Sequence, residues 1–290
     1  MSTAPTSARS AAQAMTPTAP RTTWDDLPAP VRAAIEAETG AVRAVHTISA
    51  GLNSAITARL DTRTGPVFIK GVRSDRAAGQ RREADLNPHV VPVAPRLHWQ
   101  VDTHGWHVLG FEHIDARPAR LSPGSADLSV VADTLARLGR MLPPPGACRR
   151  IEDRWADAAH AAKVDPALLA GDHLIHTDLN PHNILITQQG ARVVDWAWPT
   201  LGAGWIDPAC TALWLIAEGH APAVAEAWAA PVPSWTLASP QALDVFITTN
   251  AALWADIAAA DPRPWKQRLH DAATMWAEQR RHSAAGHSTS

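Results

Sequence analysis

The sequence contains no tyrosine, only two cysteines and only three lysines among its 290 residues. Cys148 and Cys210 have neither the spacing of a metal site nor a pairing framework, so we expect a reduced, cytoplasmic protein. The lysines are Lys70, Lys163 and Lys266, and the remaining basic residues, histidines aside, are arginines. A lysine inside an apolar strand is therefore kept where this chain otherwise uses arginine.

The sequence also lacks a strong excess of one charge and a long apolar run. A net charge of −2 gives no electrostatic reason to expect binding to nucleic acid or to an anionic membrane. No 18 consecutive residues are apolar, so no membrane span is expected. Residues 1–22 lack the apolar segment of a signal peptide, and we expect both they and residues 282–290 to be disordered tails. At 46 % apolar residues, the chain between the tails can form a substantial core.

The expected elements change in kind along the chain. After a helix ending near Gly40, strand-like runs predict one hairpin within residues 50–72 and another within residues 94–114, and a helix closed by Pro88 lies between them. Later residues mostly repeat apolar side chains at helical spacing. This order predicts an α+β, two-lobed fold, with a β-rich N-lobe at residues 23–112, a mostly helical C-lobe at residues 113–281 and a hinge near residues 109–116.

The stretch "HTDLNPHNILI" concentrates polar residues directly before a run of branched apolar ones. His176, Asp178 and Asn183 follow the pattern H-x-D-x-x-x-x-N, and "VVDW" supplies Asp195. Phosphoryl transfer needs these residue types: an aspartate takes the proton of a substrate hydroxyl, while an asparagine and a second aspartate offer oxygen ligands to Mg²⁺. Since "NILIT" and "ARVVDW" predict a hairpin, we expect Asn183 and Asp195 to lie near each other. A polar turn is the plainer interpretation of the loop alone.

The front third supplies a lysine and a carboxylate that fit the same chemistry. Lys70 ends the strand-like run "VFIK", and Glu83 lies on the helix that follows. In a kinase such a lysine contacts the nucleotide phosphates and a helical carboxylate holds it. An edge-strand lysine that prevents aggregation is the alternative for Lys70. A solvated helix position is the alternative for Glu83, and Asp85 competes with it.

A short segment before this strand offers donors for phosphate. "ISAGLNSAI" places Gly51, Asn53 and Ser54 between two strand-like runs, where backbone and side-chain groups can bind phosphate. A hairpin turn needs the same glycine, so the position of this segment ahead of "VFIK" is what gives it weight.

The order "SAGLNS", "VFIK", Glu83, "HTDLNPHN" and "VVDW" resembles the aminoglycoside phosphotransferase family. These small-molecule kinases have the two-lobed protein-kinase-like fold and include relatives of choline and homoserine kinases. The resemblance spans about residues 24–280. It implies Asp178 as catalytic base, Asn183 and Asp195 as Mg²⁺ ligands, and Lys70 at the nucleotide phosphates.

The resemblance also implies supporting roles. His176 would brace the loop, and the connection between the lobes at residues 108–114 would hold the adenine edge through backbone groups of Phe111, Glu112 and His113. Asp207, in "GWIDPAC", would brace the catalytic loop through backbone hydrogen bonds. The alternative is that Asp207 is the N-cap of the next helix, with Pro208 at its first position.

Several residues depart from the family pattern. Thr177 stands where the family usually has glycine, and Asn180 stands where histidine or a small residue is common. Trp196 and Ala197 replace the Phe-Gly of protein kinases. None of these changes removes a catalytic group.

The acceptor side has a distinctive composition. No lysine or arginine occurs between Arg192 and Arg263, and the helices after the metal-binding aspartate form the acceptor side in this fold. An acidic, aromatic wall suits a cationic amino sugar, whereas core tryptophans and solvated carboxylates are the plainer interpretation. The residues concerned are Asp207, Glu218, Glu226, Asp244, Asp256, Asp261, Trp196, Trp198, Trp205, Trp214, Trp228, Trp235 and Trp254.

We therefore expect a phosphotransferase that uses ATP, with GTP as the alternative nucleotide, and Mg²⁺. Its acceptor would be a small-molecule hydroxyl, such as that of an aminoglycoside-like or other natural-product antibiotic, and its role resistance or self-protection. A metabolite kinase of the choline or homoserine type is the first alternative. We expect a monomer or a homodimer.

Two further alternatives belong to other classes. His176, Asp178 and His182 could ligate Zn²⁺ in a hydrolase, although this leaves Lys70 and Asn183 unexplained. A catalytically silent binding protein with the kinase fold would have little reason to keep all of these polar residues.

Overall fold

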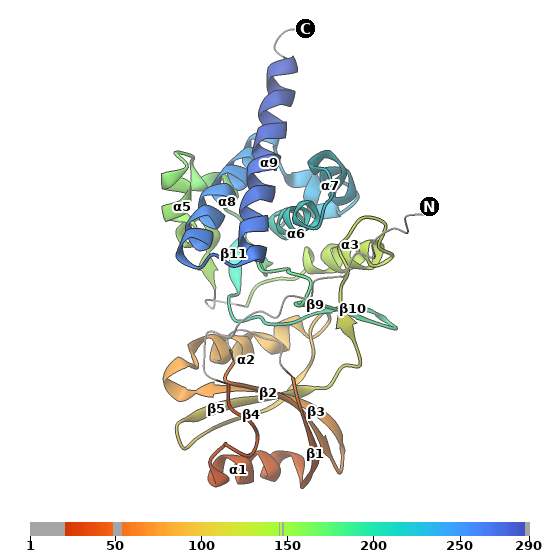
Figure 1. The fold of residues 1–290 in the computed structure, drawn as a ribbon, viewed down its shortest axis with the longest axis vertical. Helices are drawn as coiled ribbons and strands as arrows, with labels where there is room; N and C mark the ends of the chain where they lie inside the picture. Colours follow the sequence, from red (N-terminus) through yellow and green to blue (C-terminus); the bar gives the residue numbers. More distant parts are fainter. Residues whose placement is uncertain (1–20, 49–53, 145, 147, 288–290) are drawn as a thin grey trace, which may run out of the picture. The chain divides into compact units, whose positions relative to one another are not determined.

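Figure 1 shows a computed structural model of the chain, which describes residues 21–48, 54–144, 146 and 148–287. The chain forms two compact units. The first comprises the residues up to Arg76 together with Trp99–Phe111, and the second comprises Ala77–His98 together with the residues from Glu112 onward. The last passage between the units, at Phe111 and Glu112, falls inside the hinge expected at residues 109–116.

A five-stranded sheet in the order β1-β2-β3-β5-β4 dominates the first unit. β1 pairs antiparallel with β2, β2 pairs antiparallel with β3, and β4 lies beside β5, so both expected hairpins are present. The strands are β1 (Val42–Thr47), β2 (Ile56–Thr62), β3 (Gly65–Arg73), β4 (Leu97–Thr103) and β5 (Trp106–Glu112), and the 3₁₀ helix η1 (Ser74–Arg76) follows β3.

Helix α1 (Ala29–Thr39) covers the sheet of the first unit (Figure 1). Its Val31 and Ile35 are fully buried in one hydrophobic cluster with apolar residues of β2, β3 and β5. The helix ends at Gly40, whose φ of 73° is readily adopted only without a Cβ. Gly40 is therefore the C-terminal boundary that the sequence predicts.

The second unit is mostly helical and includes two small sheets, in the orders β10-β9-β6 and β7-β11-β8. Its strands are β6 (Arg117–Pro118), β7 (Arg149–Arg150), β8 (His173–Ile175), β9 (Ile184–Thr187), β10 (Gly190–Val193) and β11 (Thr200–Gly202). Its helices are α2 (Ala78–Val90), α3 (Asp127–Leu138), α4 (Ile151–Arg154), α5 (Ala156–Ala161), α6 (Ile206–Ala217), α7 (Pro222–Ala229), α8 (Pro240–Ala260) and α9 (Pro264–His287), with 3₁₀ turns η2 (Pro166–Leu169) and η3 (Pro233–Leu237).

Aromatic rings form the centre of the helical core. The ring centroid of Phe246 lies 5.9 Å from those of Trp155 and Trp205 and 6.2 Å from that of Trp276. Because these rings come from four separate parts of the chain, they join α8 and α9 to the segments that precede α5 and α6. The plainer interpretation, core packing, therefore holds for Trp205, which is buried.

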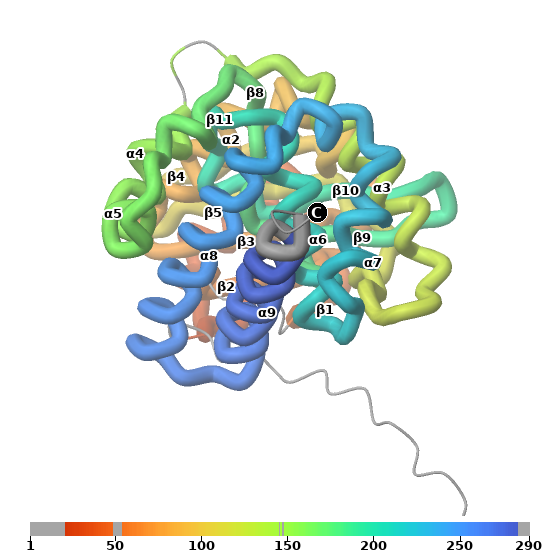
Figure 2. The backbone as a smooth tube through the Cα atoms, turned by 90° about the horizontal axis from the view of Figure 1, so that it is seen from above, coloured from red at the N-terminus to blue at the C-terminus, as the bar shows by residue number. Residues whose placement is uncertain are grey.

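Helices α8 and α9 lie side by side (Figures 1 and 2). By length and composition, α8 is the one helix in the described part of the chain that could cross a membrane. Its Leu243, Phe246 and Ile247 are buried in the core of the second unit, so packing within the unit accounts for its apolar character.

Residues 77–98 belong to the second unit, whereas the sequence placed them in the N-lobe. The reason is packing: Leu86 and Val90 of α2 lie in the hydrophobic cluster of the second unit. The N–H of Val193 also donates to the carbonyl of Val93 at 2.7 Å. Helix α2 was expected to end at Pro88 but continues to Val90, since a proline in the last turn removes only one helical hydrogen bond.

Parts of both expected tails belong to the folded units. Arg21 and Thr22 hydrogen-bond to β2 and to the residue before it, so they belong to the first unit rather than to a tail at residues 1–22. At the other end, α9 continues to His287, well inside the tail expected at residues 282–290.

Candidate active site

The loop at residues 176–183 connects β8 to β9, and the β9–β10 hairpin sets its far end beside Asp195. Ile184 pairs with Val193 in this antiparallel hairpin. The pairing continues for one more residue, because the N–H of Val194 donates to the carbonyl of Asn183 at 2.9 Å. The hairpin that the sequence predicts is therefore present, and it brings the residue before Asp195 against Asn183.

Two asparagines hold the carboxylate of Asp178. The Asn183 side chain donates to the Asp178 carbonyl at 2.9 Å and to Oδ2 at 3.1 Å, and the Asn180 side chain donates to Oδ1 at 3.0 Å. Asp178 is exposed, whereas Asn183 is buried. An oriented, solvent-facing carboxylate is the arrangement that a general base requires.

Asn180, which in sequence departs from the family pattern, is a further functional candidate in the structure. Its Oδ1 accepts the N–H groups of His182 at 2.9 Å and Asn183 at 3.2 Å, while its amide group binds Asp178. This is a local turn built by an asparagine side chain. The signal in the sequence was the Asp-x-Asn-Pro order, which is typical of such turns.

The donor set fits a magnesium ion. Because the Nδ2 group of Asn183 is used by Asp178, its Oδ1 is left as an acceptor, and no residue in the described part of the chain donates to it. Asp195 lies two residues after the end of the neighbouring strand β10. One amide oxygen and one carboxylate match the small number of protein oxygens that Mg²⁺ usually takes alongside phosphates and water.

Both ring nitrogens of His176 form hydrogen bonds within and next to the loop. Its Nδ1 accepts the N–H of Asp178 at 3.2 Å, so its Nε2 carries the proton and donates to the carbonyl of Val194 at 3.0 Å. The ring also packs edge-on against Trp196, with centroids 4.6 Å apart. With both ring nitrogens occupied, and with no metal-holding group of His, Cys, Asp or Glu among the residues described, the zinc alternative finds no support.

Asp207 binds the backbone at the start of the loop. Its carboxylate accepts the N–H of His176 at 3.1 and 2.9 Å and that of Thr177 at 2.8 Å. It is 3 % exposed, and burial raises its pKa although the hydrogen bonds and the charge of Arg154 oppose this. Helix α6 begins at Ile206 and has no side-chain cap, so the carboxylate is directed at the loop rather than at its own helix.

Lys70 lies in the interior of the first unit's sheet. Its strand, β3, is flanked by β2 and β5, which excludes the edge-strand alternative. The side chain is 8 % exposed, and its ammonium lies 5.7 Å from the centroid of the Phe111 ring. A lysine this deeply placed in a central strand is a functional candidate on physical grounds. Ser54 is buried two residues before the start of β2, whereas Gly51 and Asn53 lie outside the described residues.

Of the other residues expected to bind the nucleotide, Phe111 is the last residue of the first unit, whereas Glu83, Glu112 and His113 belong to the second. Glu83 is buried on α2 and Asp85 is exposed, so the solvated-helix alternative fits Asp85 rather than Glu83. Glu112 and His113 directly follow the last passage between the units. The Glu112 N–H donates to the carbonyl of Arg96 at 2.8 Å, and its Oε2 accepts the N–H of Arg96 at 3.3 Å.

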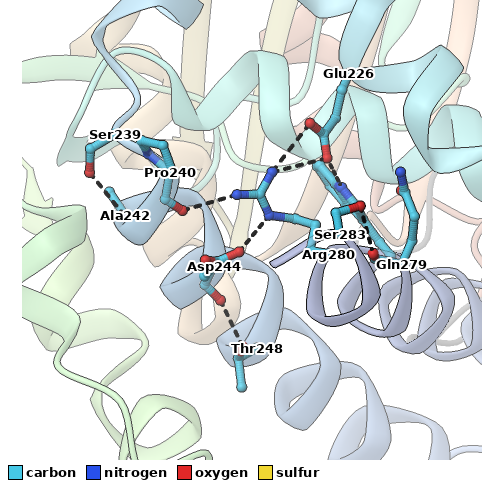
Figure 3. Close-up of polar contacts among 10 residues, drawn as sticks. Glu226, Ser239, Pro240, Ala242, Asp244, Thr248, Gln279, Arg280 and Ser283 are labelled. Atoms are coloured by element: carbon cyan, nitrogen blue, oxygen red, sulfur yellow. Dashed lines mark hydrogen bonds and ion pairs between the residues drawn. The ribbon is translucent and has the colours of Figure 1, made fainter. Parts of the chain in front are cut away.

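Three of the six acidic residues expected on the acceptor side pair with basic residues from the C-terminal part of the chain. Arg280 of α9 binds both Glu226 and Asp244 (Figure 3), and Asp261 binds Arg263 and Lys266. The stretch free of basic residues is therefore not a wall of unpaired negative charge. This weakens the inference that the acceptor must be cationic.

Most tryptophans of this stretch serve packing. Trp196 and Trp205 are buried, while Trp214 and Trp254 contact Trp265. Trp198 differs, since it is 50 % exposed and follows Asp195 by three residues.

No protein-family model and no curated protein sequence matches the chain. Solved structures of aminoglycoside phosphotransferases share its fold. A thermostable variant of aminoglycoside phosphotransferase APH(4)-Ia, solved with ADP and hygromycin B, has a TM-score of 0.61 at 13 % identity and covers 85 % of this chain and 99 % of that chain.

Two further structures are similar. Spectinomycin phosphotransferase APH(9)-Ia, solved with ADP and spectinomycin, has a TM-score of 0.52 at 13 % identity and covers 86 % of this chain and 93 % of that one. The GDP complex of aminoglycoside 2'-phosphotransferase-IIIa has a TM-score of 0.56 at 14 % identity, with coverages of 83 % and 94 %. The fold expected from the sequence, a β-rich N-terminal part and a helical C-terminal part as in these phosphotransferases, is confirmed.

Proposed function

We propose that this protein is a phosphotransferase that moves the γ-phosphate of ATP to a hydroxyl of a small molecule, with the help of Mg²⁺. The observation that carries the proposal is the fixed orientation of Asp178. Both of its carboxylate oxygens accept amide hydrogen bonds while the group faces solvent. An acceptor hydroxyl that reaches this carboxylate is oriented for transfer of its proton.

In the proposed reaction the acceptor oxygen forms a new bond to the γ-phosphorus, and the bond from that phosphorus to the β-bridging oxygen breaks, releasing ADP. The proton of the acceptor hydroxyl passes to a carboxylate oxygen of Asp178. Asn180 and Asn183 keep that carboxylate in one orientation, and Asp207 and His176 hold the backbone on either side of Thr177. When bound at Asn183 and Asp195, Mg²⁺ would neutralise the charge of the phosphates.

We propose that Lys70 and Glu83 contribute to nucleotide binding. A buried ammonium in a central strand supplies a fixed positive charge for phosphate oxygens. Ser54, with backbone groups of Phe111, Glu112 and His113, completes the nucleotide set that we propose. ATP is the first choice of nucleotide because ADP is present in two of the similar structures, and GTP is the alternative because one of them holds GDP.

For the acceptor we propose a hydroxylated natural-product antibiotic, with resistance or self-protection as the role. The similar structures contain hygromycin B and spectinomycin, both of which bear hydroxyls. A metabolite of the choline or homoserine type is the competing acceptor. We also propose a cytoplasmic location, where nucleotide is available and the free thiols of Cys148 and Cys210 stay reduced.

The test is a screen of γ-labelled ATP against hydroxylated antibiotics, including hygromycin B and spectinomycin, and against choline and homoserine. Asp178→Asn should lower transfer by about 10²- to 10⁴-fold, the usual contribution of a general base, while ATP still binds. Asp172→Asn is the matched control, since that side chain is 91 % exposed just before β8. Nucleotide binding without transfer to any acceptor, or full activity of Asp178→Asn, would overturn the proposal.

A further inference from the structure

Thr177, the residue directly before Asp178, has an unusual backbone conformation. Its φ is 66°, in the left-handed region that favours glycine and that β-branched residues rarely adopt. Such a conformation costs free energy and persists only where neighbouring groups enforce it. The sequence places threonine where glycine would be free of this strain, so something in this chain must hold Thr177.

The side chain of Arg154 stabilises this conformation of Thr177. Arg154 is the last residue of α4, and its Nη1 group donates to Oγ1 of Thr177 at 2.6 Å. The backbone N–H of Thr177 donates to the buried carboxylate of Asp207 at 2.8 Å. Thr177 is therefore bound at its backbone by one element and at its side chain by another.

The same guanidinium reaches the segment that follows Asp195. Its Nη1 also donates to Oγ1 of Thr200 at 2.8 Å, and the hydroxyl of Thr200 donates to the carbonyl of Trp198 at 2.9 Å. Asp195, like Thr177, has a positive φ, of 67°. Arg154 thus joins the two segments that carry the proposed base and the proposed metal-binding carboxylate.

Arg154 carries its charge without an ion pair. No carboxylate within the described part of the chain lies within salt-bridge distance of it, and its acceptors are neutral hydroxyls and a carbonyl. Burial lowers the pKa of the guanidinium, while the charges of Asp178 and Asp207 oppose that effect. A half-buried guanidinium that meets only neutral acceptors gains no ion-pair stabilisation, so a role in the site is the better account of its placement.

We propose that Arg154 is a positioning residue, which holds Thr177 in its left-handed conformation and so fixes the direction of the Asp178 carboxylate. The expected effect on catalysis rests on the proposed function, whereas the expected effect on the backbone at Thr177 does not. It also explains how this chain tolerates threonine at a position suited to glycine: Arg154 binds the hydroxyl that glycine lacks.

A double-mutant cycle of Arg154→Met and Thr177→Gly tests the inference, because glycine adopts this φ without strain. The first readout is hydrogen exchange of the backbone amides of residues 173–186. Arg154→Met should raise exchange there by about 10- to 100-fold, the range that a hydrogen bond to a charged group carries. In the Thr177→Gly background the same substitution should have little effect. Arg149→Met, at an exposed neighbouring arginine, is the matched control.

The second readout is ADP release from Mg·ATP without an added acceptor, water taking the place of the hydroxyl. Arg154→Met should lower kcat while leaving KM for ATP unchanged, and Arg154→Lys, which keeps the charge and a donor, should restore part of kcat. Where Arg154→Met fails to fold, Arg154→Gln replaces it in the cycle.

Additive effects of the two substitutions on exchange and on kcat would overturn the inference, since Arg154 would then act independently of Thr177. The inference would also be overturned if Arg154→Lys and Arg154→Met lowered kcat equally and both raised KM for ATP. Unchanged ADP release in Asp178→Asn would instead contradict the proposed function, and the exchange measurements would still decide the role of Arg154.

Discussion

Asn183 donates its side-chain amide twice to Asp178, at 2.9 Å to the backbone carbonyl and at 3.1 Å to the carboxylate. These bonds fix which end of the amide faces Asp178 and therefore turn Oδ1 of Asn183 away from it. One residue can in this way orient the proposed base with its nitrogen and offer its oxygen to Mg²⁺. The two proposed roles are consequently coupled through a single side chain.

Replacing the two proposed metal ligands should separate these roles. Asp195→Ala should lose the part of ATP binding that depends on Mg²⁺, while the hydrogen bonds around Asp178 stay intact. Asn183→Leu should lose that part as well and should also remove the hydrogen bond to Oδ2 of Asp178, because leucine has neither a donor nor an oxygen. Calorimetric titration with ATP, in Mg²⁺ and in EDTA, measures the difference, which we expect to be about 10- to 100-fold in affinity.

Asp256→Asn is the control for this titration, since that aspartate lies on α8 with an exposed side chain. An Asp195→Ala protein that keeps the full Mg²⁺ dependence would show that the ion is held by other groups.

Asp207→Asn should destabilise the protein. The carboxylate accepts two backbone N–H groups from a buried position, whereas an asparagine offers only one acceptor oxygen and turns an NH₂ group toward one of the donors. We expect a loss of about 2 to 4 kcal/mol in the free energy of unfolding. Urea denaturation followed by tryptophan fluorescence measures it, and a loss below about 0.5 kcal/mol, the range of neutral surface substitutions, would contradict the prediction.

Arg280 joins three helices of the second unit (Figure 3). Its Nη1 lies 3.3 Å from both carboxylate oxygens of Glu226 on α7, its Nη2 donates to the carbonyl of Pro240 at 3.2 Å, and its Nε binds Asp244 on α8. Arg280→Met keeps the length of the side chain but leaves two carboxylates without their cation. We expect a loss of about 1 to 3 kcal/mol in the free energy of unfolding, because hydrogen bonds between charged groups that are partly buried contribute more to stability than fully exposed ion pairs do.

Arg281→Met is the matched control for this prediction, since Arg281 is the exposed neighbour on the same helix. Equal unfolding free energies of the two variants would mean that the network adds nothing measurable to stability. Any gain in binding of a cationic acceptor such as hygromycin B by Arg280→Met alone would show that Glu226 and Asp244 lie on its path.

Local signals in the sequence predicted the elements that carry the site, and non-local packing decided the rest. The β9–β10 hairpin and the H-x-D-x-x-x-x-N loop depend on residues close in sequence, so their positions follow from pattern alone. The assignment of residues 77–98 to the second unit depends on contacts such as Val93 with Val193, which no local pattern encodes.

The difference between local and non-local contacts also explains why the sequence did not predict the roles of Arg154 and Arg280. The bond between Arg154 and Thr177 spans 23 residues, and that between Arg280 and Glu226 spans 54. A composition count over the stretch from Arg192 to Arg263 could register its acidic residues but not the basic residues of α9 that pair with them. The expectation of an acidic wall overlooked these three pairs for that reason.

The pair formed by Arg117 and Asp127 should make stability depend on pH. Arg117 donates to both carboxylate oxygens of Asp127, at 2.6 and 2.7 Å, and the backbone N–H of Arg120 adds a third bond at 2.8 Å. The hydrogen bond from Arg117 is the main cause that lowers the pKa of Asp127. A carboxyl whose folded pKa lies below its unfolded value stabilises the fold above the unfolded pKa, about 3.9, and loses that contribution as pH falls through the folded pKa.

Comparison of the wild type with Asp127→Asn isolates this contribution from other titrating groups. The free energy of unfolding should differ by about 1 to 2 kcal/mol at pH 7, a value reduced by the partial exposure of Arg117. The difference should shrink once the pH falls below about 4, because a protonated Asp127 no longer binds the guanidinium as an ion. Asp133→Asn, at an exposed aspartate on the same helix, should show no such trend. A difference between the wild type and Asp127→Asn that stays constant from pH 7 to the acid limit would show that ionisation of Asp127 contributes nothing to stability.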